Sequence, residues 1–124
     1  MRKNERRLRR SHLKGPALSL QLQACTERSG VDAMILADGD GLVVASSPWN
    51  DDSTEQIAAQ MAHVGVHQFR VATLREGGLP RTVAARGFQA GEHDLVLCAV
   101  GCPTERTLGE LYTAIGGIKR ILSA

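Results

Sequence analysis

Two apolar runs around an Asp-Gly-Asp-Gly turn constrain the fold of this 124-residue chain more than any other feature. Residues 31–37 are apolar on both alternating faces, residues 38–41 form the turn, and residues 42–45 are apolar again. Asp-Gly dipeptides between two such runs are the strongest short-range signal of a β-hairpin. Because both faces of these strands are apolar, the fold must cover the sheet on both sides.

A second pair of apolar runs, at residues 82–90 and 94–100, predicts another hairpin. A helix is predicted before the first hairpin, beginning at Pro16 and ending before Gly30. The last helix is predicted to start at residues 103–104, because apolar residues then recur every three or four positions.

The middle helix is predicted to open at residues 51–53, where two pairs of residues have capping-box spacing. It should run to about Arg75, before Gly77-Gly78 stops it. The predicted order is therefore helix, hairpin, helix, hairpin, helix. Strands joined by short turns are antiparallel. We predict an α/β (α+β) fold, a three-layer α/β/α sandwich with the first and last helices on one face and the middle helix on the other.

The charge is distributed unevenly along the chain. Residues 1–14 contain seven basic residues and one acidic residue, a net charge of +6, whereas the remainder carries −4. With Leu8 and Leu13 as its bulky apolar residues, this segment cannot bury enough surface to fold alone. We predict a basic disordered tail at residues 1–15, followed by one domain at residues 16–124. Residues 1–14 could bind an anionic partner weakly.

The cysteines and the hydropathy suggest a location. Cys25, Cys98 and Cys102 cannot all pair within one chain. No apolar run reaches membrane-spanning length, and the basic N-terminus lacks the apolar stretch of a secretory signal. Free thiols without an export signal predict a cytoplasmic protein. Cys98 lies in an apolar strand and is expected to be a buried, inert thiol. Cys102 lies at a predicted helix start, where the pKa of a thiol can be lowered, so a reactive Cys102 remains an alternative.

Three patterns are compatible with a metal site but favour a simpler interpretation. Asp38 and Asp40 resemble the start of a calcium loop, but the later positions of that loop lack oxygen ligands. His63 and His67 have the i, i+4 spacing of a helical metal pair, without the glutamate of a zinc protease. Cys98 and Cys102 form one loose pair rather than a zinc site. We expect no metal and no cofactor.

Nucleotide-binding and catalytic motifs are also missing from the sequence. The P-loop pattern Gly-x-x-x-x-Gly-Lys-[Ser/Thr] does not occur, so the chain cannot hold a nucleotide phosphate in that way. The Gly-x-Ser-x-Gly elbow of hydrolases does not occur either. We therefore expect a binding protein without an active site of its own.

The order and spacing of the elements resemble those of the roadblock (dynein-light-chain-like) family. The opening of such domains is similar to residues 30–46, and the family's final strand before its last helix is similar to residues 93–101. The resemblance covers about residues 17–123. Members usually have an additional sheet-edge strand in the stretch that corresponds to residues 76–83, which is short here. The resemblance implies a homodimer that serves as a platform for a GTPase or a motor component, as in the bacterial mutual-gliding-type regulators.

The predicted middle helix would carry both interaction surfaces. Small residues in one row allow close helix packing, either on the chain's own sheet or across a homodimer two-fold axis. The family resemblance favours the second, and the expected dimer residues are Ala58, Ala62, Gly65 and Phe69. A polar stripe on the same helix is expected to be partner-facing, and it consists of Gln56, Gln60, His63, His67 and Arg70.

Two classes of function follow. The first is a homodimeric regulator or scaffold that binds a small P-loop GTPase of the Ras-like kind, with a preference for the GTP-bound form. The alternative is binding of nucleic acid or an anionic surface through the Arg-rich tail, which would depend strongly on salt. The acidic folded part and the scarcity of aromatic residues favour the first class.

Overall fold

The structure is a computed structural model that describes residues 2–49, 53–76, 79–101 and 105–123, with side chains described at 14–49, 53–75, 80–101 and 107–123. In these ranges it contains three helices and five strands. The elements follow one another as α1 (Arg2–Ser29), β1 (Ala33–Asp38), β2 (Val43–Ser46), α2 (Thr54–Met61), β3 (Phe69–Glu76), β4 (Leu79–Ala90), β5 (His93–Val100) and α3 (Glu105–Ser123).

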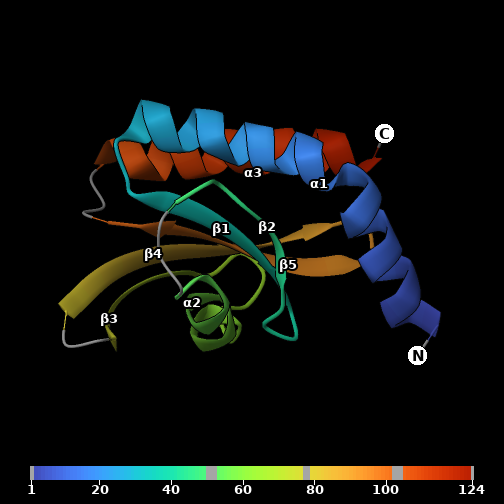
Figure 1. Ribbon diagram of the computed structural model, residues 1–124, viewed down its shortest axis with the longest axis horizontal. Helices are drawn as coiled ribbons and strands as arrows, with labels where there is room; N and C mark the ends of the chain where they lie inside the picture. The colour runs from blue at the N-terminus through green and yellow to red at the C-terminus, as the bar shows by residue number, and fades with distance from the viewer. Residues whose placement is uncertain (1, 50–52, 77–78, 102–104, 124) are drawn as a thin grey trace.

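The five strands form one antiparallel sheet in the order β2-β1-β5-β4-β3. Figure 1 shows α1 and α3 side by side on one face of this sheet and α2 on the other. The predicted three-layer α/β/α sandwich is therefore confirmed. The predicted element order is wrong at one place, because the middle helix is followed by three strands instead of two.

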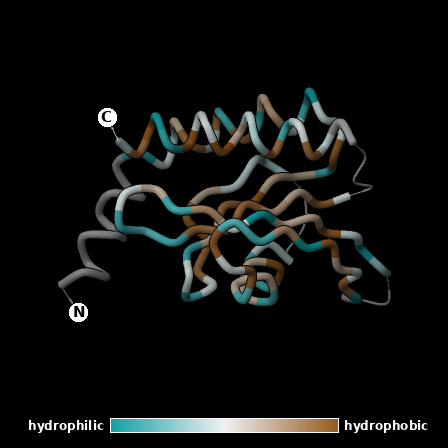
Figure 2. The backbone as a smooth tube through the Cα atoms, turned by 180° about the vertical axis from the view of Figure 1, so that it is seen from behind, coloured by the Kyte–Doolittle hydropathy of each residue, from teal (hydrophilic) through white to brown (hydrophobic). Residues whose placement is uncertain are grey.

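The core has two halves, one on each face of the sheet. On the α1/α3 face, side chains such as Leu18, Leu36, Leu97 and Ile118 are fully buried. On the α2 face the buried set is smaller and includes Ile57. The hydropathy colouring in Figure 2 shows apolar segments concentrated in the strands between the helical layers. Strands that are apolar on both faces thus give a core on both faces, as the sequence predicted.

The middle helix differs most from its prediction. It ends at Met61, and residues 69–76 form the edge strand β3 instead of its second half. All eight residues of β3 pair with β4, from Phe69 with Arg86 to Glu76 with Leu79. This pairing supplies the edge strand that the family resemblance implied, seven residues earlier than the stretch to which it was assigned.

The first helix begins earlier than predicted, at Arg2 instead of Pro16, and contains Pro16 in its interior. Lys14 lies against the domain, since its Nζ atom donates hydrogen bonds to the carbonyl oxygens of Ile121 (2.9 Å) and Leu122 (3.2 Å). A cation at these carbonyls complements the negative end of the α3 dipole. Lys14, which was expected in the tail, thus contacts α3, while the division of the chain into a disordered tail and a domain at residue 15 stays a prediction.

Candidate functional site

The exposed side of α2 and the turn after it carry three of the five predicted partner-binding residues. Ile57, Ala58 and Met61 are buried against the sheet, so the opposite side of this short helix faces outward. Gln56 and Gln60 are exposed there, and His63 is exposed in the turn that follows. The Nδ1 atom of His63 lies 2.8 Å from the Gln60 carbonyl oxygen, so this nitrogen is the donor of that contact.

The loop at residues 62–68 returns the chain from α2 to the sheet. The Gly65 N–H donates to the side-chain oxygen of Gln68 at 2.9 Å. The His67 N–H donates to the Gly87 carbonyl, and the Gly87 N–H donates to the Gln68 carbonyl, each at 2.9 Å. His67 adopts a left-handed conformation with φ of 66°, which is rare for a residue with a side chain. His67 therefore lies on a constrained loop and not on a helical stripe.

Arg70 lies on β3 and faces the same side of the sheet as α2. Alternate residues of a strand point to opposite faces. Ala72 and Leu74 pack against the α2-side core, so Arg70 shares their face, and its side chain is exposed. The predicted stripe is therefore wrong as a helical feature. Its residues are distributed over α2, a loop and β3. We define the α2-side polar set as Gln56, Gln60, His63 and Arg70.

The four residues predicted for a dimer interface do not form one surface. Ala58 is fully buried in the core of its own chain, so the interpretation as packing on its own sheet is correct for this residue. Ala62 is the C-cap of α2, and Gly65 lies in the loop beyond it. Phe69 points to the opposite face of the sheet, where 40% of its side chain is exposed. Ala58, Ala62 and Gly65 do not form one helical row, because α2 ends at Met61.

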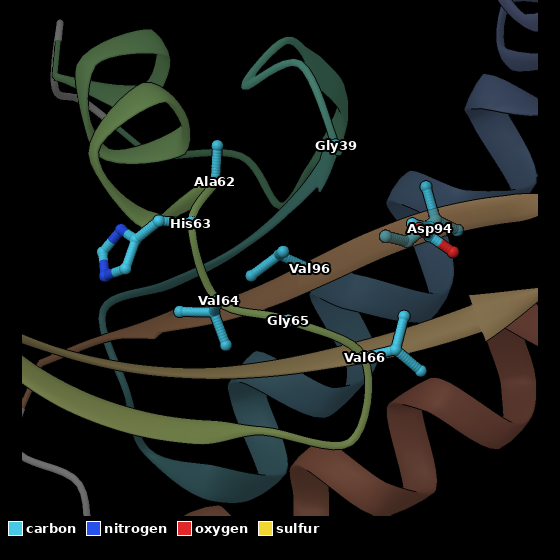
Figure 3. A pocket seen from close by; sticks show the side chains of 9 residues that line it. Gly39, Ala62, His63, Val64, Gly65, Val66, Asp94 and Val96 are labelled. Atoms are coloured by element: carbon cyan, nitrogen blue, oxygen red, sulfur yellow. The ribbon is translucent and has the colours of Figure 1, made fainter.

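A small pocket lies beside the end of α2, between the loop and the first residues of β5. Its volume is about 160 Å³. Figure 3 shows the His63 ring and Asp94 on opposite sides of the pocket, with Val64 and Val96 between them. Small-molecule sites are usually larger, about 300–1,000 Å³. Ala62 and Gly65 line this pocket too, so the structure brings them together with His63 in a shallow hollow of the α2 side.

The sequence did not single out the contact between Trp49 and Arg81 on the same side of the sheet. The Arg81 guanidinium carbon lies 5.3 Å from the centre of the Trp49 ring. The indole N–H of Trp49 donates to Thr54 Oγ1 at 2.7 Å, at the first residue of α2. The sole tryptophan of the chain thus fixes the start of α2 and forms a cation–π pair with β4. In the sequence, only the position of Trp49 just before a predicted helix could have indicated this contact.

The described thiols and the acidic turn have structural roles. Burial raises the pKa of the Cys98 thiol to about 12, so it remains protonated at neutral pH. Burial also raises the pKa of Cys25, against a smaller opposite effect of Arg28. Asp38 Oδ1 accepts the N–H groups of Asp40 (2.9 Å) and Leu42 (3.0 Å), which closes the hairpin turn. Cys102 lies outside the described residues.

The described side chains of this face are polar groups without a metal-ligand cluster. Among the residues that the structure describes, no group of three or more His, Cys, Asp or Glu side chains is placed to hold a metal ion. The α2-side polar set presents amides, an imidazole and a guanidinium on an open surface. Such an arrangement is suited to docking a macromolecule by hydrogen bonds and charge.

Comparisons with known proteins identify the fold. Three solved structures are similar to this chain over most of its length. MglB of Myxococcus xanthus has a TM-score of 0.62 at 12% identity, with 86% of this chain and 87% of that chain covered. An MglB with a tetrameric arrangement has a TM-score of 0.63 at 17% identity, with 89% and 90% covered. A Roadblock/LC7 domain from Streptomyces avermitilis has a TM-score of 0.56 at 16% identity, with 86% and 98% covered.

The chain has the roadblock fold. No protein-family model and no curated protein matches the sequence itself, so the roadblock likeness is one of structure. The order of helices and strands explains this likeness, since both hairpins and the edge strand β3 are present. None of the described helices of this chain is long and apolar enough to cross a membrane.

Proposed function

We propose that this roadblock chain is a homodimeric, non-catalytic regulator or scaffold that binds a small Ras-like GTPase through the α2-side polar set. The observation that carries the proposal is the fold likeness to two MglB structures over 86–90% of each chain. The resemblance found in the sequence implies the same role for the family. Free thiols at Cys25 and Cys98 favour a cytoplasmic location for this role.

The geometry of the α2 side supports a docking role. Gln56, Gln60 and His63 extend along the exposed side of α2 and its C-terminal turn, and Arg70 extends the surface to the edge of the sheet. The switch loops of a GTPase change shape with the γ-phosphate, so a partner that contacts them distinguishes the two nucleotide states. We propose tighter binding to the GTP-bound form. The comparisons give no support to the alternative of nucleic-acid binding.

Arg70 and Arg75 offer a matched pair for testing this surface. Both arginines are exposed on β3, but they lie on opposite faces of the sheet, since they are five residues apart. Binding of Ras-like GTPases from the same genome is measured by titration calorimetry, with GDP or a non-hydrolysable GTP analogue bound. Arg70→Glu should weaken binding by about tenfold, mainly through slower association, whereas Arg75→Glu should bind like wild type.

The possible outcomes separate three mechanisms. Equal affinity for the GDP-bound and GTP-bound GTPase would support only a passive scaffold. Equal weakening of binding by Arg70→Glu and Arg75→Glu would mean that the GTPase does not bind at the α2-side polar set. Single-turnover GTP hydrolysis with Arg70→Ala tests a donated side chain, because an arginine finger accelerates hydrolysis by about 10³–10⁵. We expect Arg70→Ala to lower the rate of GTP hydrolysis only in proportion to its loss of GTPase binding. Light scattering at micromolar concentration tests the homodimer, and a monomer would contradict it.

A further inference from the structure

The N-terminal segment, residues 2–13, is strongly basic and leaves the domain at a defined point. It contains six arginine and lysine residues and one glutamate, which gives a net charge of +5. Lys14, the next residue along the chain, is held at the carbonyl oxygens of Ile121 and Leu122 at the C-terminal end of α3. The segment therefore starts from a fixed corner of the α1/α3 layer.

The course of α1 changes near this corner. Pro16 has no N–H for the helical hydrogen bond to the residue four positions before it, and a proline inside a helix produces a kink. Figure 1 shows the first part of α1 (blue) turned away from α3 and running past one end of the sheet toward the layer of α2. The turn that joins β1 and β2 lies at this same end of the sheet.

The hollow beside the end of α2 opens at that end of the sheet as well. Gly39 of the β1–β2 turn lines it together with Asp94 of β5, and the Cβ position of Gly39 is 3.7 Å from the backbone oxygen of Asp94. Two layer spacings of about 10 Å each separate the α1/α3 layer from the α2 layer. Twelve residues span about 18 Å as a helix and about 40 Å when extended, so the segment is long enough to reach the hollow.

The walls of the hollow are apolar, and a carboxylate lies at one side (Figure 3). Val64 and Val96 are 3% and 2% exposed, and Val66 completes the walls. Asp94 Oδ1 accepts a hydrogen bond from Gln89 Nε2 at 3.2 Å, which orients the carboxylate. A volume of about 160 Å³ suits one long side chain better than a small molecule. Lysine and arginine bury an aliphatic stem against apolar surface and carry their charge at its end.

We propose that the hollow binds an arginine or lysine side chain of the chain's own N-terminal segment. The stem of this side chain would lie along the valines, and its charged end would meet Asp94. Charge complementarity selects this occupant, because the segment carries +5 and starts at the same end of the molecule. His63 also lines the hollow, so the docked segment covers one member of the α2-side polar set. The segment is thus a salt-sensitive cover of the α2 side.

The test follows the backbone amide signals of the hollow by NMR in the full chain. One exposed ion pair contributes little to the free energy of unfolding, so the melting temperature does not report this contact. In a full-length variant with glutamine at the six basic positions of residues 2–10, the signals of Gly65, Val66 and Asp94 should shift relative to wild type. Raising the salt from about 50 to about 500 mM should move the wild-type signals toward those of the variant. Signals that neither change alters would overturn the proposal.

Asp94 and Glu92 offer a matched pair of carboxylates for assigning the contact. Both are exposed at this end of the sheet, but Asp94 lines the hollow, whereas Glu92 lies in the turn before β5. In Asp94→Asn, replacing the basic residues of the segment should no longer shift the signals of Gly65 and Val66. In Glu92→Gln the shift should persist. Equal shifts in both backgrounds would indicate a nonspecific attraction and overturn the proposal.

A labelled peptide with the sequence of residues 1–13 tests the occupant. It should bind the full-length glutamine variant at least about fivefold more tightly than wild type, because the wild-type segment competes at a high effective concentration. Equal binding to both proteins would overturn the proposal. A molecular mass in light scattering that falls in the glutamine variant would assign the hollow to the segment of a second copy, with the same consequence. None of these measurements uses a GTPase, so failure of this proposal is distinguishable from failure of the proposed function.

Discussion

Gly87 of β4 lies directly against the backbone of Gly65 in the loop that follows α2. A Cβ atom on Gly87 would lie 2.6 Å from the carbonyl carbon of Gly65 and 3.0 Å from the carbonyl oxygen of Val64. Val66 also forms a parallel bridge with Gly87. The loop therefore rests on the sheet at a position without a side chain, and this contact determines where the chain turns from α2 into β3.

Replacing Gly87 by Ala should destabilise the domain. The added methyl group has no space, so we expect a loss of about 1–3 kcal/mol and a melting temperature lower by several degrees. Circular dichroism on heating measures it. Gly109→Ala is the control, because nothing lies within 4 Å of its Cβ position in α3 and alanine favours a helix by about 0.5–1 kcal/mol. A Gly87→Ala variant as stable as wild type would contradict the contact.

The contact of Lys14 with the end of α3 should contribute measurably to stability. Lys14→Met keeps most of the aliphatic stem but removes the charge at the carbonyl groups of Ile121 and Leu122, at a cost of about 0.5–1 kcal/mol. Deletion of residues 1–13 should leave the melting temperature nearly unchanged, since that segment has no core-forming pattern. A large decrease on deletion would show that the segment packs on the domain.

The buried thiol of Cys98 predicts a loss of stability at alkaline pH. Its pKa is raised from 9.0 to about 12, so the folded state holds the proton more tightly than the unfolded state. This contribution is fully present below pH 9 and declines between pH 9 and 12, by on the order of 1 kcal/mol per pH unit. Denaturant unfolding between pH 8 and about 10.5 should show a weaker pH dependence in Cys98→Ala than in wild type. Parallel curves would contradict the assignment.

The hairpin turn should depend on Asp38 as a hydrogen-bond acceptor and not as a metal ligand. Asp38→Ala leaves the N–H groups of Asp40 and Leu42 without their acceptor, and we expect a loss of about 1–3 kcal/mol. Asp38→Asn keeps one oxygen and should lose less. Calcium or a chelator should leave the melting temperature of wild type unchanged, because a bound ion would raise it with concentration.

Both hairpins could be predicted because their signals are local. The first was predicted at residues 31–37 and 42–45 and is found at Ala33–Asp38 and Val43–Ser46. Asp-Gly turns and flanking apolar runs act within a few residues, so no distant contact is needed to recognise them. Strands apolar on both faces then required helices on both sides, and the layers followed from that requirement.

The extent of α2 could not be predicted, because distant contacts decide it. Residues 62–75 contain no proline and include apolar residues at helical spacing, so a continued helix was consistent with the local pattern. The outcome depends on β4, whose edge pairs with all eight residues of β3, and on Gly87, which accommodates the loop. Strand formation is determined by such neighbours more than by intrinsic preference.

The candidate site was predicted only in part, because it depended on the extent of α2. Gln56, Gln60 and His63 were predicted on an exposed helical side and are found there, since α2 and its C-terminal turn include them. Arg70 and Phe69 were expected on the middle helix and lie on β3 instead, where they point to opposite faces of the sheet. A single change from helix to strand moves neighbouring residues to opposite sides of the sheet.

Side chains alternate between the two faces of the sheet along β3, so this strand has two chemically different sides that are separated only by the thickness of the sheet. Arg70 faces the layer of α2, whereas Arg75 faces the layer of α3. Two molecules that bind at these two sides do not compete for the same surface. Two molecules bound there at the same time would be separated by little more than the thickness of the sheet. A substitution on one side of this edge strand can therefore change one surface and leave the other intact.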